Sequence, residues 1–138
     1  MTTDVVLGRP GMGKTEYLIN ALNEYDGSTC LVSLEYPEAL IRKRGLKDTV
    51  SVLSLDLHEV TAETILAFCR ETRPRLVAID YLEPLPLQVD LAILQKDLEA
   101  MGVRHFIITS QLRRDMKPCS QERINAIPCN QICLPAGN

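Results

Sequence analysis

The stretch Gly8-Arg9-Pro10-Gly11-Met12-Gly13-Lys14-Thr15 decides the fold of this chain. It matches the pattern of a glycine, four residues of any type and then Gly-Lys-Ser/Thr, which forms a P-loop when a strand precedes it and a helix follows. The apolar run Val5–Leu7 comes directly before it, and apolar residues at helical spacing follow. We therefore expect backbone N–H groups and the positive end of a helix dipole to bind phosphate here.

Each residue type in this loop has a physical task. The glycines allow the backbone to turn inward around phosphate oxygens. Lys14 would reach the β- and γ-phosphates, and Thr15 would offer its hydroxyl to Mg²⁺. The predicted nucleotide-binding residues are Gly8, Arg9, Pro10, Gly11, Met12, Gly13, Lys14 and Thr15. The alternative, a glycine-rich turn that caps a helix and binds nothing, is disfavoured by the Lys-Thr pair in this register.

The rest of the chain alternates short aliphatic runs with helical periodicities. The predicted strands cover residues 5–7, 30–34, 50–53, 76–79 and 106–109, with a last one near 132–134. The predicted helices follow the P-loop, run from Pro37 to Arg44, follow an N-cap at Thr61, run from Leu91 to Met101 and surround Arg123. This alternation predicts an α/β fold of the P-loop NTPase class, with a mainly parallel sheet and helices on both faces. Residues 1–138 are expected to form one domain.

Composition limits the classes of partner. The chain has 15 basic and 18 acidic residues, a net charge of −3, so no global positive field attracts nucleic acid or anionic lipid. Two basic clusters, Arg42–Arg44 with Lys47 and Arg113–Arg114 with Lys117, are interpreted as helix-end or solvated charge rather than contacts to a phosphate backbone.

Targeting signals and cysteines indicate the compartment. No stretch approaches 18 apolar residues, and the N-terminus lacks the pattern of a signal peptide. The five cysteines are an odd number, and Cys119, Cys129 and Cys133 lack the paired spacing of a zinc site. We therefore expect a cytoplasmic protein with reduced thiols and no membrane span.

Polar residues at the ends of predicted strands are the candidate catalytic groups. Asp80 ends the most apolar strand, where a Walker B carboxylate would support Mg²⁺ through water. Tyr81 follows it, so the Asp-Glu pair that gives many ATPases their base is missing. Glu35 is expected to orient water instead, because parallel strands present their carboxyl ends to the ligand. Gln111 would reach the same edge and sense the γ-phosphate. The alternatives are a solvated glutamate, a surface glutamine and, for Asp80, an acidic cap.

Together these motifs resemble the RecA-like ATPase core of DnaB-type replicative helicases. The resemblance covers about residues 5 to 114 and rests on Gly8–Thr15, Ser33-Leu34-Glu35, Ile79-Asp80-Tyr81-Leu82 and Ser110-Gln111-Leu112 with Arg114, in the family's order. It implies a Mg²⁺-dependent, ATP-hydrolysing domain that acts in DNA replication or recombination. Its implied partners are single-stranded DNA and a helicase or recombinase subunit.

The resemblance also implies a role for each matched residue. Lys14 and Thr15 would bind ATP and Mg²⁺, and Asp80 would support the metal. Glu35 would activate water. Gln111 would couple the nucleotide state to polynucleotide-binding loops.

The chain departs from the family's pattern at both ends. Four residues precede the first predicted strand, so assembly into a ring through an N-terminal linker helix is not expected. The segment after the fifth strand is too short for the whole hairpin that supplies an arginine finger. Arg113, Arg114 and Arg123 are candidate substitutes, although solvated surface charge is the simpler interpretation. The loop after Asp80 is also short. In the family that region and the one after Gln111 face the central channel, which weakens the expectation of single-strand binding.

Two other functions stay open. The missing arginine-finger region suits a non-hydrolysing ATP-binding module that docks on a helicase or recombinase, because such a finger can be worth about 10³-fold or more in rate. A small-molecule kinase also uses a P-loop. It is less favoured, because the chain shows no arginine-rich lid segment and its Ser-Leu-Glu and Ser-Gln motifs differ from those of kinases.

Overall fold

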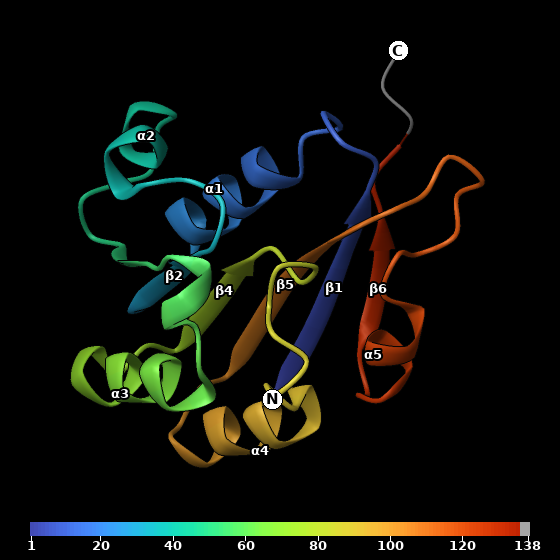
Figure 1. The fold of residues 1–138 in the computed structure, drawn as a ribbon. Helices are drawn as coiled ribbons and strands as arrows, with labels where there is room; N and C mark the ends of the chain where they lie inside the picture. The colour runs from blue at the N-terminus through green and yellow to red at the C-terminus, as the bar shows by residue number, and fades with distance from the viewer. Residues whose placement is uncertain (136–138) are drawn as a thin grey trace.

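The computed structural model describes residues 1–135 and shows a sheet between two layers of helices (Figure 1). The strands are β1 (Thr2–Gly8), β2 (Thr29–Ser33), β3 (Ser51–Ser54), β4 (Leu76–Asp80), β5 (His105–Gln111) and β6 (Asn130–Cys133). The helices are α1 (Lys14–Glu24), α2 (Glu38–Lys43), α3 (Ala62–Thr72), α4 (Leu91–Ala100) and α5 (Gln121–Asn125), with a 3₁₀ turn η1 (Leu57–Glu59). Across these residues, no helix has both the length and the apolar character needed to cross a membrane.

The strands form one sheet in the order β3-β2-β4-β5-β1-β6, and every neighbouring pair is parallel. The predicted α/β class, with a parallel sheet covered on both faces, is therefore confirmed. Strand β5 lies between β1 and β4, so the end of β1 and the end of β4 are separated by one strand. Because all strands run in the same direction, their carboxyl ends meet at one edge of the sheet.

Two hydrophobic cores hold the helices against the sheet. Strand side chains alternate between the faces, so that Val5 and Leu7 join one core while Val6 joins the other. Helices α3, α4 and α5 pack on the first core, and α1 and α2 pack on the second. Figure 1 shows α1 and α2 on one side of the sheet and α3 and α4 on the other.

Several predicted boundaries are wrong by a few residues. Strand β1 begins at Thr2 rather than Val5, because its polar first residues pair with β5 through the backbone. Pro37 precedes α2 instead of starting it, since its ψ of 154° is extended. The last strand spans Asn130–Cys133 rather than 132–134, because pairing with β1 sets its position. The N-cap at Thr61 is confirmed, as its hydroxyl accepts a bond from the Thr64 N–H.

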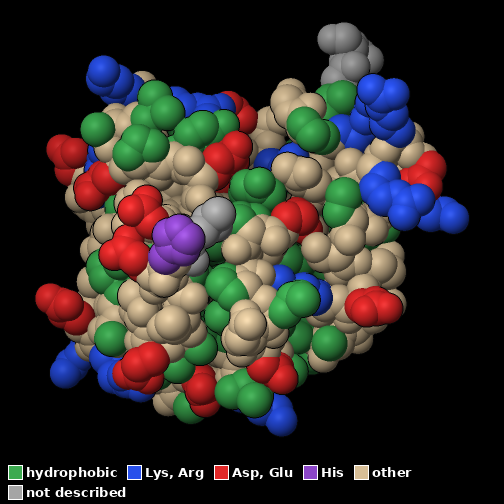
Figure 2. Space-filling view, viewed as in Figure 1, with side chains coloured by type: hydrophobic (Ala, Val, Ile, Leu, Met, Phe, Trp, Pro, Cys, Tyr) green, Lys and Arg blue, Asp and Glu red, His purple; other side chains and the backbone are tan. Residues whose placement is uncertain are grey.

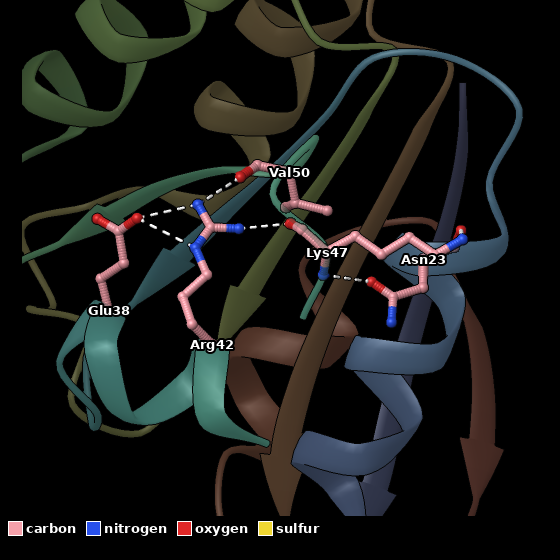
Figure 3. A network of polar contacts seen from close by, with 5 residues as sticks. All are labelled: Asn23, Glu38, Arg42, Lys47 and Val50. Atoms are coloured by element: carbon pink, nitrogen blue, oxygen red, sulfur yellow. Dashed lines mark hydrogen bonds and ion pairs between the residues drawn. The ribbon is translucent and has the colours of Figure 1, made fainter. Parts of the chain in front are cut away.

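A network around Arg42 fastens α2 to its neighbours (Figure 3). The Arg42 guanidinium donates to Glu38 Oε2 at 2.9 Å, to the Lys47 carbonyl at 2.5 Å and to the Val50 carbonyl at 2.7 Å. The Lys47 N–H in turn donates to Asn23 Oδ1 on α1 at 2.9 Å. The loop between α2 and β3 is thereby held against both α1 and the start of β3.

Loss of this network should destabilise the fold. We expect Arg42→Ala to lower the free energy of unfolding by about 1–3 kcal/mol, because two carbonyl groups and a carboxylate lose a charged donor. Lys43→Ala on the same short helix is the matched control and should change it by less than about 0.5 kcal/mol, because Lys43 is exposed. Urea unfolding followed by circular dichroism measures both; equal effects would show that the network adds nothing.

Candidate functional site

A cavity of about 420 Å³ opens at the carboxyl edge of the sheet. The sheet register aligns the strand ends around it, with Gly8 opposite Gln111 and Ser33 opposite Asp80. The cavity is lined by Pro10, Gly11, Gly13, Lys14, Thr15, Glu16, Glu35, Tyr36, Arg44, Asp80, Tyr81 and Gln111. The structure therefore brings the predicted residues Glu35, Asp80 and Gln111 together with most of the P-loop. Gly8, Arg9 and Met12 belong to the same loop but do not line the cavity.

The glycines of the loop are needed where they stand. Gly11 and Gly13 have φ values of +80° and +89°, in the left-handed region that favours glycine. Gly13 is also the N-cap of α1, whose first N–H groups have no partner inside the helix and remain available to an anion. A Cβ on Gly8 would lie 3.0 Å from Lys14 Cγ. Glycine at this position therefore leaves room for the Lys14 side chain, which crosses over it.

The Lys14 ammonium folds back onto its own loop. Its Nζ donates to the carbonyl of Gly8 at 3.0 Å and to that of Arg9 at 3.2 Å. Burial lowers the pKa of Lys14, although the nearby carboxylates of Asp80, Glu83 and Glu35 act in the opposite direction. A partly desolvated cation held by two neutral carbonyls would gain from an incoming anion.

Asp80 is the most buried charged group of the cavity, with an exposed fraction of 1%. Its Oδ2 accepts a bond from Thr15 Oγ1 at 3.0 Å, and its Oδ1 accepts one from Thr109 Oγ1 at 2.8 Å. Burial raises the pKa of Asp80, while these two hydrogen bonds and Lys14 oppose the shift. Thr109 was not predicted as a site residue; in the sequence it is only a hydroxyl residue at the end of the predicted strand 106–109.

The oxygens of Thr15 and Asp80 fit a Mg²⁺ ion. The Thr15 hydroxyl donates its hydrogen bond to Asp80, so the lone pairs of its oxygen could bind a cation on the cavity side. A hydroxyl and a carboxylate are hard oxygen donors, which Mg²⁺ prefers, and a small number of protein ligands is usual when phosphates supply the others.

Glu83 is a further residue that the sequence interpretation missed. Its Oε1 accepts a bond from the Gln111 N–H at 2.7 Å. Its Oε2 accepts bonds from the hydroxyls of Ser110 at 2.7 Å and Ser120 at 2.5 Å. Glu83 thus ties the loop after β4 to the end of β5 and to the segment before α5. Its position three residues after Asp80 does not distinguish it from a solvated glutamate.

Arg44 also lines the cavity, although the sequence analysis interpreted it as part of a basic cluster at a helix end. It forms an ion pair with Glu16 of α1. Its Cζ lies 5.3 Å from the centre of the Tyr36 ring, which is the distance of a cation–π contact. Of the residues that line the cavity, Lys14 and Arg44 are the basic ones.

The three arginines considered as finger substitutes lie away from the cavity lining. The Arg123 guanidinium donates to the carbonyls of Leu85 at 2.7 Å and Val89 at 3.1 Å, so the interpretation of Arg123 as solvated charge is wrong. Arg113 pairs with Asp115 at 2.5 Å. Figure 2 shows basic side chains gathered over the loop after β5, where Arg113, Arg114 and Lys117 are exposed.

Comparison with known proteins adds no family to this geometry. A scan against protein-family models found no match, and a search of curated proteins found no similar sequence. Function is therefore inferred from the cavity and the residues around it.

Proposed function

We propose that this protein binds Mg·ATP in the cavity at the carboxyl edge of its sheet and hydrolyses it. The observation that carries the proposal is the Thr15–Asp80 hydrogen bond beside Lys14. Strand β1 ends in a loop with two left-handed glycines, a helix begins at Lys14, and a buried carboxylate from β4 reaches the next residue. These are the parts that phosphate and magnesium binding require, in the order along the chain that the P-loop pattern demands.

Three of the lining residues would then have a direct role in binding. Lys14 would exchange its two carbonyl partners for the β- and γ-phosphates, and the N–H groups that open α1 would bind the remaining oxygens. Thr15 would hold Mg²⁺, with Asp80 supporting it. Bound there, Mg²⁺ would neutralise charge on the terminal phosphates.

Hydrolysis needs a group that orients water, and Glu35 is the candidate. It follows β2, lines the cavity and is solvent-exposed, so water reaches its carboxylate. Gln111 ends β5 on the same edge, and Glu83 fixes its backbone. The order of these motifs supports a RecA- or DnaB-like domain acting in DNA replication or recombination, with single-stranded DNA or a helicase or recombinase subunit as partner.

A non-hydrolysing module that docks on a helicase or recombinase is the second candidate. It is favoured by one observation: Arg113 and Arg123 are bonded to Asp115 and to backbone carbonyls of the same chain. In this arrangement both guanidinium groups are engaged within the chain.

Lys14 should contribute strongly to the affinity for ATP. Lys14→Ala should weaken ATP binding about tenfold or more, because a charge-assisted contact to phosphate is lost. Titration with a fluorescent ATP analogue measures the affinity. Lys96→Ala, an exposed lysine on α4, is the control and should bind as the unmodified chain does. If both variants bound ATP with equal affinity, the cavity would not be the nucleotide site.

A change at Asp80 should affect metal binding and leave metal-free nucleotide binding intact. Asp80→Asn should weaken ATP binding about tenfold when Mg²⁺ is present. The reason is that loss of a group that supports the ligands of a metal lowers the affinity for that metal about 10–100-fold. With EDTA present the variant and the unmodified chain should bind ATP alike. A melting temperature within a few degrees of the original serves as the folding control, and a loss that is the same with and without Mg²⁺ would contradict the metal role.

Glu35 should affect the rate of hydrolysis and not the affinity for ATP. Glu35→Gln should slow phosphate release about 10²-fold or more while leaving ATP affinity nearly unchanged, because only the orientation of water is lost. Steady-state phosphate release, with and without single-stranded DNA, gives the rate. If the unmodified chain binds ATP without turnover, the non-hydrolysing module is the correct function.

A further inference from the structure

We propose that Arg44 is an ATP-sensing residue of this chain, which exchanges Glu16 for the terminal phosphate of the bound nucleotide. This inference rests on the proposed function and assigns a role that neither the P-loop pattern nor the helicase resemblance gives. The group that would contact the phosphate comes from the same chain, at the end of α2.

The position of Arg44 is fixed by its neighbours. It is the C-cap of α2, and the network of Arg42 holds that helix against α1 and β3 (Figure 3). The adjacent Gly45 carbonyl accepts a bond from Asn23 Nδ2 on α1 at 2.8 Å. The backbone at Arg44 is therefore anchored on both sides, and only its side chain needs to move.

The Arg44 side chain lines the cavity and is also exposed to solvent. The side chain is 32% exposed, stacks on Tyr36 and pairs with Glu16, and all three residues line the cavity. Tyr36 is itself held at the end of β2, where its carbonyl accepts a bond from Ser33 Oγ at 2.6 Å. The Tyr36 ring thus supports the Arg44 guanidinium in the wall of the same cavity that the P-loop lines.

Glu16 places an anion close to the phosphate cradle. It lies in the first turn of α1, and its Oε2 is 3.9 Å from the position that a Cβ on Gly13 would occupy. A carboxylate there interacts favourably with the positive end of the helix dipole, as a phosphate would. Arginine binds carboxylates and phosphates with the same planar set of donors, so one anion can replace the other.

Exchange of the two anions would make the site sensitive to the γ-phosphate. With ADP, the cradle holds the β-phosphate and Arg44 keeps its pair with Glu16. With ATP, the extra phosphate lies farther from the P-loop and meets the second cation of the cavity. Arg44 then contributes to ATP binding and not to ADP binding.

The test compares the affinities for ADP and for a non-hydrolysable ATP analogue, both with Mg²⁺, by calorimetry. Arg44→Ala should weaken binding of the ATP analogue about tenfold, the size of a lost charge-assisted contact, and leave ADP binding within about twofold. Lys43→Ala, one residue away and exposed, should change neither. Loss of affinity for both nucleotides in equal measure, or for neither, would overturn the role of Arg44.

Glu16→Gln provides an independent readout in which binding should become stronger. Removing the competing carboxylate should tighten binding of the ATP analogue about two- to fivefold, the range expected for an exposed ion pair, since Glu16 is 56% exposed. In the Arg44→Ala background the same change should have no effect. Weaker binding of the analogue by Glu16→Gln would contradict the exchange. An unmodified chain that binds neither nucleotide would instead refute the proposed function itself.

Discussion

The buried carboxylate of Asp80 connects three elements of the structure through its two oxygens. Thr15 at the start of α1 donates to one oxygen, and Thr109 on β5 donates to the other. Because β5 separates β4 from β1, a carboxylate on β4 would not reach the P-loop helix by strand pairing alone. The two threonines bridge this distance. They also satisfy a charge that burial would otherwise make costly, which keeps the ends of β4, β5 and α1 in one arrangement.

The cations of the cavity are held in a different way. Lys14 is bonded to two carbonyls of its own loop, and Arg44 is paired with the carboxylate of Glu16 on the preceding helix, α1. Both positive groups thus have partners that a phosphate could replace. Pre-positioned but exchangeable partners keep a charged site folded before its ligand arrives, and they reduce the ordering required when it binds.

The sequence predicted the fold well because apolar periodicity determines which segments become strands and helices. It failed at boundaries where polar residues join the sheet through the backbone, as at Thr2 and Asn130. Among the site residues, Asp80, Glu35 and Gln111 could be found because each lies at or just after the end of a strand, and parallel strands end at the same edge. Their catalytic roles stay predictions.

Thr109, Glu83 and Arg44 could not be found by the same reasoning. Each acquires its role from contacts with elements distant in sequence: Thr109 from β4, Glu83 from the segment before α5, and Arg44 from α1. A threonine in a strand, a glutamate in a loop and an arginine at a helix end are each ordinary in isolation. Only the three-dimensional arrangement distinguishes them.

Strand β6 covers the edge of β1 and so affects how readily this sheet could pair with another chain. Residues Asp4–Leu7 of β1, with the apolar run Val5–Leu7, pair with β6, and three of the four residues of β6 are exposed. An uncovered β1 would present free N–H and C=O groups along an apolar strand, which is the template on which other chains aggregate. At this edge of the sheet the outermost strand is β6, which begins with the polar residues Asn130 and Gln131. The contribution of β6 is thus mainly one of backbone pairing, and detachment of this one strand would expose the sheet edge closest to the P-loop.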